Sequence, residues 1–268
     1  MRAVGLSPAF GHARRMTRRI ALLLEYDGTL FAGSQLQTNA RTVQSVLEAA
    51  VEKATEVASR VAFAGRTDAG VHAEGQVAAF VTESAHDIET MRRALNAWLP
   101  EDVAVLAVTD VDAAFDPRRS AVRRRYRYVI DNRQVRPALV RQRAWHVAPA
   151  LDEGAMAKAA ASVLGSRDFA AFASRLEDEG ASTVRRLERF EVARDGSIVT
   201  YVLEANAFLP HQVRRMVGAL VEVGKGKLDA AGYEGLLRGA AASAGPAAPP
   251  HGLYLERVFY ERDPFGPT

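Results

Sequence analysis

The stretch AGRTDAGVHAEGQV, residues 64–77, places one carboxylate, Asp68, two residues after Arg66 and between Gly65 and Gly70. Short apolar segments at residues 60–65 and 76–81 flank it, which predicts a loop that joins two strands. A loop anchored at both ends can hold a side chain still. Because the chain contains no cysteine for covalent chemistry, Asp68 is the first candidate for a catalytic group.

The composition is that of a globular protein. The chain has 268 residues, 48% of them hydrophobic and 25% charged, which is enough for one large or two small domains. No apolar run approaches the ~20 residues of a membrane helix, and the N-terminal residues lack the pattern of a secretory signal. The absence of cysteine excludes disulfides and thiolate metal sites and fits a reducing compartment. We therefore expect a cytoplasmic protein without membrane partners.

Arginine is concentrated in one segment. Ten arginines lie between Arg118 and Arg143 against a single acid, Asp131, so the local charge balance is +9. The planar guanidinium suits phosphate oxygens, and such a cluster is typical of nucleic-acid binding. A solvated basic face without a partner is the alternative. Arg124 and Arg143 are our candidates for contacts to an RNA backbone.

Residues 120–130 alternate in the manner of a strand. One face would carry Val122, Arg124, Tyr126, Tyr128 and Ile130, and the other Arg123, Arg125, Arg127 and Val129. A strand tyrosine ordinarily packs its ring in the core. Beside so many arginines, however, the Tyr126 ring could also stack on a base that has left its helix.

Strand and helix patterns occur in both halves of the chain, which predicts an α+β fold. Amphipathic helices are expected over residues 42–57, 87–98, 153–164 and 211–224, and the second would bury Ile88, Met91, Leu95 and Trp98. We expect a basic N-terminal tail over residues 1–17 and two α+β subdomains over residues 18–114 and 115–262. Each would have a mixed or antiparallel sheet flanked by helices.

Two other chemistries find less support. The segment EYDGT, residues 25–29, is similar to the motif of magnesium-dependent phosphatases, but Glu25 stands where their attacking aspartate belongs. The extra methylene would misplace the attacking oxygen. The six histidines show no paired ligand spacing, so no metal site is expected, and His72 is predicted to be a hydrogen-bonding scaffold.

Seven motifs in order resemble the tRNA pseudouridine synthase A family, from about residue 20 to 260. They are YDGTLFAGSQLQ (26–37), TVQSVLE (42–48), GRTDAGVHAEGQV (65–77), LNAWLPEDV (95–103), FDPRRSAVRRRYRY (115–128), DFAAF (168–172) and FLPHQVRRMVGAL (208–220). The GRTDAGVHA block alone is highly specific.

The resemblance implies the pseudouridine synthase fold, with a basic catalytic cleft between the two halves, and an isomerase that turns uridine into pseudouridine without any cofactor. Asp68 would be the nucleophile or base, Tyr126 would pack on the target uracil, and Arg66 and Arg214 would flank the aspartate. The implied substrate is the anticodon stem-loop of tRNA, at positions 38, 39 and 40, and the implied assembly is a homodimer. A nearby arginine favours the ionised carboxylate that this chemistry needs.

The chain departs from the family pattern at two positions. Ser34 replaces the usual tryptophan of the GWQ motif, and Arg215 replaces the asparagine that commonly follows the helix arginine. The first puts in doubt a packing or RNA contact near the cleft. A non-catalytic RNA-binding protein remains the main alternative, because binding would need the arginine strand but not Asp68.

Overall fold

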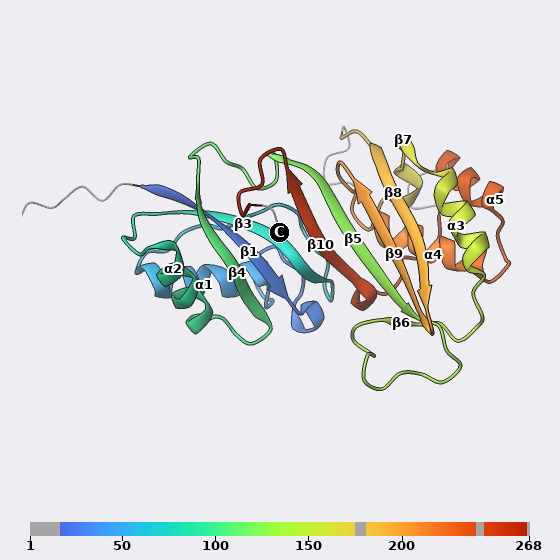
Figure 1. Ribbon diagram of the computed structural model, residues 1–268, viewed down its shortest axis with the longest axis horizontal. Helices are drawn as coiled ribbons and strands as arrows, with labels where there is room; N and C mark the ends of the chain where they lie inside the picture. The colour runs from blue at the N-terminus through green and yellow to red at the C-terminus, as the bar shows by residue number, and fades with distance from the viewer. Residues whose placement is uncertain (1–16, 175–180, 240–243, 267–268) are drawn as a thin grey trace, which may run out of the picture.

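The computed structural model describes residues 17–174, 181–239 and 244–266 (Figure 1). The tail expected over residues 1–17 therefore lies, except for Thr17, outside the described residues. Ten strands form one mixed sheet, and five α-helices accompany it in the described part of the chain. None of these helices has the length and apolarity needed to cross a membrane. The predicted α+β class is confirmed.

The N-terminal half contributes the left part of the sheet in Figure 1. Its strands are β1 (Arg18–Tyr26), β2 (Ala62–Phe63), β3 (His72–Thr82) and β4 (Val103–Val111). Two helices, α1 (Val43–Thr55) and α2 (Ile88–Trp98), pack on these strands and on each other. Thr42 begins α1 with a capping box, in which its hydroxyl accepts from the Ser45 N–H and the Ser45 hydroxyl accepts from the Thr42 N–H.

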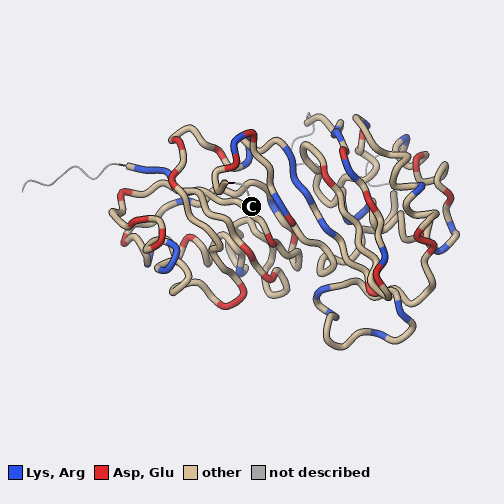
Figure 2. Tube along the Cα trace, viewed as in Figure 1, with Lys and Arg blue, Asp and Glu red and all other residues tan. Residues whose placement is uncertain are grey.

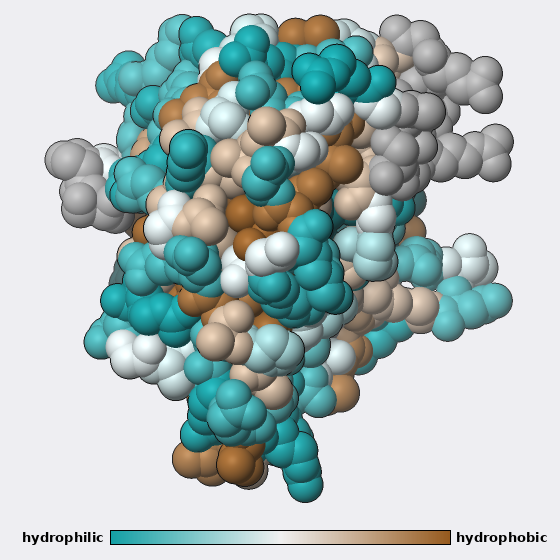
Figure 3. Space-filling model, turned by 90° about the vertical axis from the view of Figure 1, so that its right-hand side faces the viewer, coloured by the Kyte–Doolittle hydropathy of each residue, from teal (hydrophilic) through white to brown (hydrophobic). Residues whose placement is uncertain are grey.

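The C-terminal half contributes the right part of the sheet and three helices. Its strands are β5 (Ala121–Asp131), β6 (Trp145–His146), β7 (Gly165–Asp168), β8 (Val184–Asp195) and β9 (Ile198–Ala205). Its helices are α3 (Glu153–Ser162), α4 (Gln212–Gly224) and α5 (Ala230–Gly235). β8 and β9 form the hairpin that the Asp195–Gly196 turn predicts. At the end of the molecule seen in Figure 3, a strip of apolar residues lies between hydrophilic ones.

The last strand, β10 (Leu253–Tyr260), joins the two halves into one sheet. It pairs in parallel with β3 and antiparallel with β5, so the strand order is β4-β1-β3-β10-β5-β9-β8-β7. The sheet therefore runs without interruption across the boundary that we expected between the subdomains. The division of the chain at residues 114–115 remains a prediction.

The helices of both halves cover the same side of the sheet (Figure 1). Neighbouring strands place Ala73, Leu255 and Tyr126 in register, and this row faces the helices. The alternate residues of β5 point to the opposite, open side. Residues of β5, β10, the loop between β2 and β3 and the start of α4 line a pocket.

Two expectations about local structure are wrong in detail. The loop around Asp68 is shorter than predicted at its second end, since β3 already begins at His72, and β2 ends at Phe63, before the end of the expected segment. In α2, Met91 and Leu95 are fully buried, but Ile88 and Trp98 are 46% and 58% exposed. The helix contacts its neighbours only along a narrow stripe, which leaves its first and last apolar residues outside.

Candidate active site

Asp68 lies on the loop between β2 and β3, residues 64–71, which we call the aspartate loop. The start of this loop is hydrogen-bonded to β3, and its end continues directly into β3 at His72. Ala64 donates its N–H to the Val77 carbonyl at 2.8 Å, and Gln76 donates from its side chain to the Gly65 carbonyl at 2.8 Å. Val71 donates to the Asp68 carbonyl, which closes a turn through Gly70 at φ +78°. The anchored loop expected from the sequence is present, and Asp68 is at its tip.

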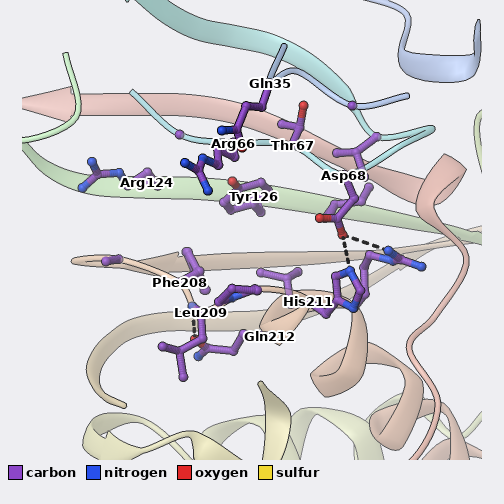
Figure 4. Close-up of a pocket in the computed structure, with 18 of the residues that line it drawn as sticks. Gln35, Arg66, Thr67, Asp68, Arg124, Tyr126, Phe208, Leu209, His211 and Gln212 are labelled. Atoms are coloured by element: carbon purple, nitrogen blue, oxygen red, sulfur yellow. Dashed lines mark hydrogen bonds and ion pairs between the residues drawn. The ribbon is translucent and has the colours of Figure 1, made fainter. Parts of the chain in front are cut away.

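Two side chains at the start of α4 hold the Asp68 carboxylate. Arg214 Nη1 donates to Asp68 Oδ2 at 2.8 Å, while Arg214 Nε donates to the Ala248 carbonyl at 2.8 Å. His211 Nε2 lies 3.4 Å from the same carboxylate oxygen (Figure 4). The Arg214 side chain is only 14% exposed, whereas that of Asp68 is 35% exposed. The carboxylate is thus fixed by a charge-assisted hydrogen bond and is still accessible from the pocket.

Sequence reasoning did not single out His211. Its backbone is left-handed, with φ 62° and ψ 1°, at the N-cap of α4. Such a conformation is uncommon outside glycine, although histidine adopts it more readily than most residues. The only signal in the sequence is the motif FLPHQVRR itself, and periodicity could not reveal the conformation that points the imidazole at Asp68.

Tyr126, on β5, lines the same pocket as Asp68. Its ring packs edge-on against Phe208, with the ring centroids 5.2 Å apart. Burial raises the pKa of the Tyr126 phenol, so the hydroxyl stays protonated at neutral pH. A base placed between Tyr126 and Asp68 would meet an aromatic surface on one side and a carboxylate on the other (Figure 4).

The pocket between these groups has a volume of about 760 Å³ and a basic rim. Arg66 lies beside Tyr126, at the end of the pocket away from Asp68 (Figure 4). Arg118 and Arg185 also line it. A cavity of this size accommodates a nucleotide, and the arginines at its edge suit the phosphates on either side. The structure therefore brings Asp68, Tyr126, Arg66 and Arg214 into one site.

Arg124 is placed differently from the exposed RNA contact that we expected. It is 9% exposed, and its guanidinium donates to four backbone carbonyls, those of Ala64, Arg118, Ala121 and Asn206. These hydrogen bonds join the start of the aspartate loop to β5 and to the segment after β9. A phosphate contact by Arg124 stays a prediction, but the geometry favours a bracing role.

Arg143 is engaged elsewhere. It binds the Asp27 carboxylate through both terminal nitrogens, at 2.7 and 2.6 Å, and it is absent from the described lining of the pocket. Burial opposes the ionisation of Asp27, but the hydrogen bonds from Arg143 and Thr29 outweigh it and hold the Asp27 pKa well below its usual range. Asp27, the aspartate of the EYDGT segment, is therefore occupied by an ion pair.

His72 is the scaffold that we predicted. Its Nδ1 accepts from the Gly28 N–H at 3.0 Å, and its Nε2 lies 3.0 Å from the Gln142 carbonyl and 3.2 Å from that of His251. Burial lowers the His72 pKa, and the nearby Arg143 lowers it further. The neutral ring with a proton on Nε2 satisfies all three contacts.

The remaining arginines of β5 alternate with Arg124 and pair with acids. In Figure 2 a run of basic residues lies along the middle of the sheet, with acidic residues on neighbouring strands. Arg123 contacts Glu188 and Glu204, Arg125 contacts Glu204 and Glu256, and Arg127 contacts Glu74. Arg133 also pairs with Asp131, so together with Arg143 at least five of the ten clustered arginines are ion-paired within the protein. The local charge of +9 overstates the field available to RNA.

A mixed sheet with an anchored carboxylate, an aromatic wall and a basic rim defines an enzyme that modifies a nucleotide within RNA. The chain belongs to the tRNA pseudouridine synthase family, whose sequence model matches residues 23–118 and 159–261. Members of this family are isomerases.

Curated relatives align over nearly the whole chain. A tRNA pseudouridine synthase A of Roseiflexus castenholzii is 47% identical, and the alignment covers 92% of each chain. The corresponding protein of Myxococcus xanthus is 44% identical over 92% of this chain and 93% of its own. That of Geobacter sulfurreducens is 42% identical over 90% of this chain and 99% of its own.

Proposed function

We propose that this protein isomerises uridine to pseudouridine at positions 38, 39 and 40 in the anticodon stem-loop of tRNA, with Asp68 as nucleophile or base. The observation that carries the proposal is the Asp68 carboxylate, held by Arg214 in a pocket that Tyr126 also lines. The named relatives support the reaction, and the sequence motifs support the positions. We further propose that the enzyme acts as a homodimer in the cytoplasm.

The reaction is balanced without a co-reactant. The bond between uracil N1 and ribose C1′ breaks, C5 bonds to C1′ instead, C5 loses a proton and N1 gains one. Cleavage of the glycosidic bond builds positive character on the sugar, which a carboxylate at that sugar can stabilise, trap covalently or relieve by removing a proton. Asp68 has the exposure and the fixed orientation for each of these roles.

We propose supporting roles for Tyr126, Arg66 and Arg214. Tyr126 would stack on the flipped uracil and recover part of the few kcal/mol that unstacking costs. Arg66, at the other end of the pocket, would either fill the space that the flipped nucleotide leaves or bind the phosphate next to it. Arg214 would hold the Asp68 carboxylate in its orientation.

The direct test is to map pseudouridine in tRNA incubated with the purified protein. After chemical labelling of pseudouridine, primer extension should stop at positions 38–40 in treated tRNA but not in untreated tRNA, and at no other uridine of the anticodon arm. Binding without any new stop would favour the non-catalytic RNA-binding alternative.

We expect activity to persist in excess chelator. No group of three or more potential metal ligands lies together among the described residues. A prefolded stem-loop that needs no magnesium should be modified in EDTA at a rate within about twofold of the control, because the proposed proton and carboxylate steps use only protein groups. A loss of activity that only added metal restores would contradict this prediction.

The salt dependence of tRNA binding should reveal how many phosphates the arginines of the pocket rim contact. About five phosphate contacts give a slope of −4 for log affinity against log salt, since each contributes ~0.9 in duplex and ~0.7 in single strands. Arg118→Ala should weaken all tRNAs alike and reduce the slope by about one. Arg123→Ala is the matched control, because Arg123 is ion-paired on the open face.

Salt titrations of the wild type and both variants test whether tRNA binds along the pocket rim or elsewhere on the protein. A wild-type slope near zero, or an equal loss of slope in Arg118→Ala and Arg123→Ala, would place the RNA path outside the described pocket rim. A change confined to Arg118→Ala would support it.

A further inference from the structure

Thr67, the residue before Asp68, is held by a single neighbouring residue at both of its backbone polar groups. The Thr67 N–H donates to Ser34 Oγ at 2.9 Å, and the Ser34 N–H donates to the Thr67 carbonyl at 3.0 Å. The Thr67 hydroxyl lies 2.8 Å from the Tyr26 hydroxyl. The backbone that carries Asp68 is thus clamped from the loop between β1 and α1.

The clamp is buried and rests on a fixed support. Ser34 is 1% exposed, so water does not replace its hydroxyl. The Gly33 and Ser34 carbonyls accept from the Val43 and Gln44 N–H groups in the first turn of α1. Ser34 therefore connects α1 to the aspartate loop through hydrogen bonds alone.

The approach of the two loops is close at Gly33. Gly33 has φ +96°, and a Cβ built on it would lie 2.8 Å from the Thr67 carbonyl oxygen. Only glycine combines this conformation with this distance. The short approach is what brings the small Ser34 side chain within reach of the Thr67 N–H.

Ser34 is also one of the two departures from the family pattern. Tryptophan, the usual residue, has an indole N–H that can only donate, so it cannot accept from the Thr67 N–H. The serine hydroxyl can. In this chain the departure adds a hydrogen bond directly before the proposed catalytic residue.

We propose that Ser34 is a positioning residue, whose hydroxyl fixes the Asp68 carboxylate by accepting from the Thr67 N–H. The inference rests on the proposed role of Asp68. Without the hydroxyl, the buried Thr67 N–H would have to move toward another acceptor, and Asp68 would move with it. A displacement of about 1 Å at a reacting group can lower a rate by about 100-fold.

The test compares Ser34→Ala with Ser45→Ala. Ser45 is a matched control because its hydroxyl also accepts a backbone N–H, from Thr42 at 3.1 Å, but it does so in the capping box of α1. We expect Ser34→Ala to lower kcat by about 10- to 100-fold with KM for tRNA within about twofold. Ser45→Ala should lower thermal stability and keep kcat within about twofold of the wild type.

Amide hydrogen exchange provides a readout independent of activity. In Ser34→Ala the amides of the aspartate loop should exchange at least about tenfold faster, while those of α1 keep their protection. Tyr26→Phe, which removes the hydroxyl partner of Thr67, is a second variant and should shift kcat and exchange in the same direction. It remains informative if Ser34→Ala does not fold.

The outcomes separate the two proposals. If the wild type forms no pseudouridine, the proposed function fails, whereas faster exchange of the aspartate loop would still demonstrate the clamp. If Ser34→Ala loses no more kcat than Ser45→Ala, or if exchange in the aspartate loop is unchanged, Ser34 is not a positioning residue.

Discussion

The Asp68→Asn variant is expected to form no measurable pseudouridine, a loss of about 10⁴-fold or more in kcat, as is usual when the central group of a catalytic unit is removed. The amide has nearly the size of the carboxylate and can still accept from Arg214, but it lacks the charge that the reaction uses. Binding of tRNA should be unchanged or slightly tighter, because one negative charge leaves a basic pocket. Single-turnover assays and a binding titration measure the two quantities separately.

Asp110→Asn is the matched control for this substitution. Asp110 also pairs with an arginine, since Arg18 Nε lies 2.8 Å from Asp110 Oδ1, but it is on β4 and outside the pocket. It should retain full turnover. Near-normal turnover in Asp68→Asn would show that Asp68 is not the catalytic group, and a parallel loss in both variants would indicate a folding defect instead.

The aspartate loop could be predicted from sequence because its information is local. Glycine at two positions and apolar segments on both sides of Asp68 specify a strand, a tight loop and a strand within 25 residues. The apolar face of α4 is likewise a local pattern, with Val213, Met216, Val217 and Leu220 at helical spacing, and all four are buried. The approach of Arg214 to Asp68 spans 146 residues, and only the family resemblance suggested it.

The partners of charged residues could not be predicted in the same way. Alternation along β5 correctly separated Arg124 from Arg123 and Arg125, but it could not supply the carbonyls or acids that each would meet. Arg125 reaches Glu204, 79 residues away, because β9 lies beside β5 in the sheet. The order of strands is set by packing between distant segments, and the position of β10 between β3 and β5 follows from no periodicity.

Arg214→Ala is expected to lower kcat by about 10- to 100-fold, which corresponds to the 1.5–3 kcal/mol of a typical hydrogen bond to a charged group. Two contacts are lost at once, the one to Asp68 Oδ2 and the one to the Ala248 carbonyl. Asp68 would keep its loop but lose the cation that orients it. Arg214→Lys should recover only part of the rate, because a single ammonium cannot reproduce the fork that spans both acceptors. Steady-state kinetics at saturating tRNA measure kcat without the contribution of binding.

Arg194→Ala is the control, because Arg194 also links a backbone carbonyl to other polar groups but does so away from the pocket. Its Nη2 donates to the Leu151 carbonyl at 3.0 Å and to Asn132 Oδ1 at 3.1 Å, and its Nε lies 3.6 Å from a Glu153 oxygen. Arg194→Ala should therefore reduce stability and leave kcat within about twofold, since it alters no group near Asp68. If Arg214→Ala instead raises KM and keeps kcat, Arg214 binds RNA and does not orient the carboxylate. If both variants lose kcat in proportion to their loss of stability, the contact between Arg214 and Asp68 is structural, and the orientation of Asp68 depends on the aspartate loop alone.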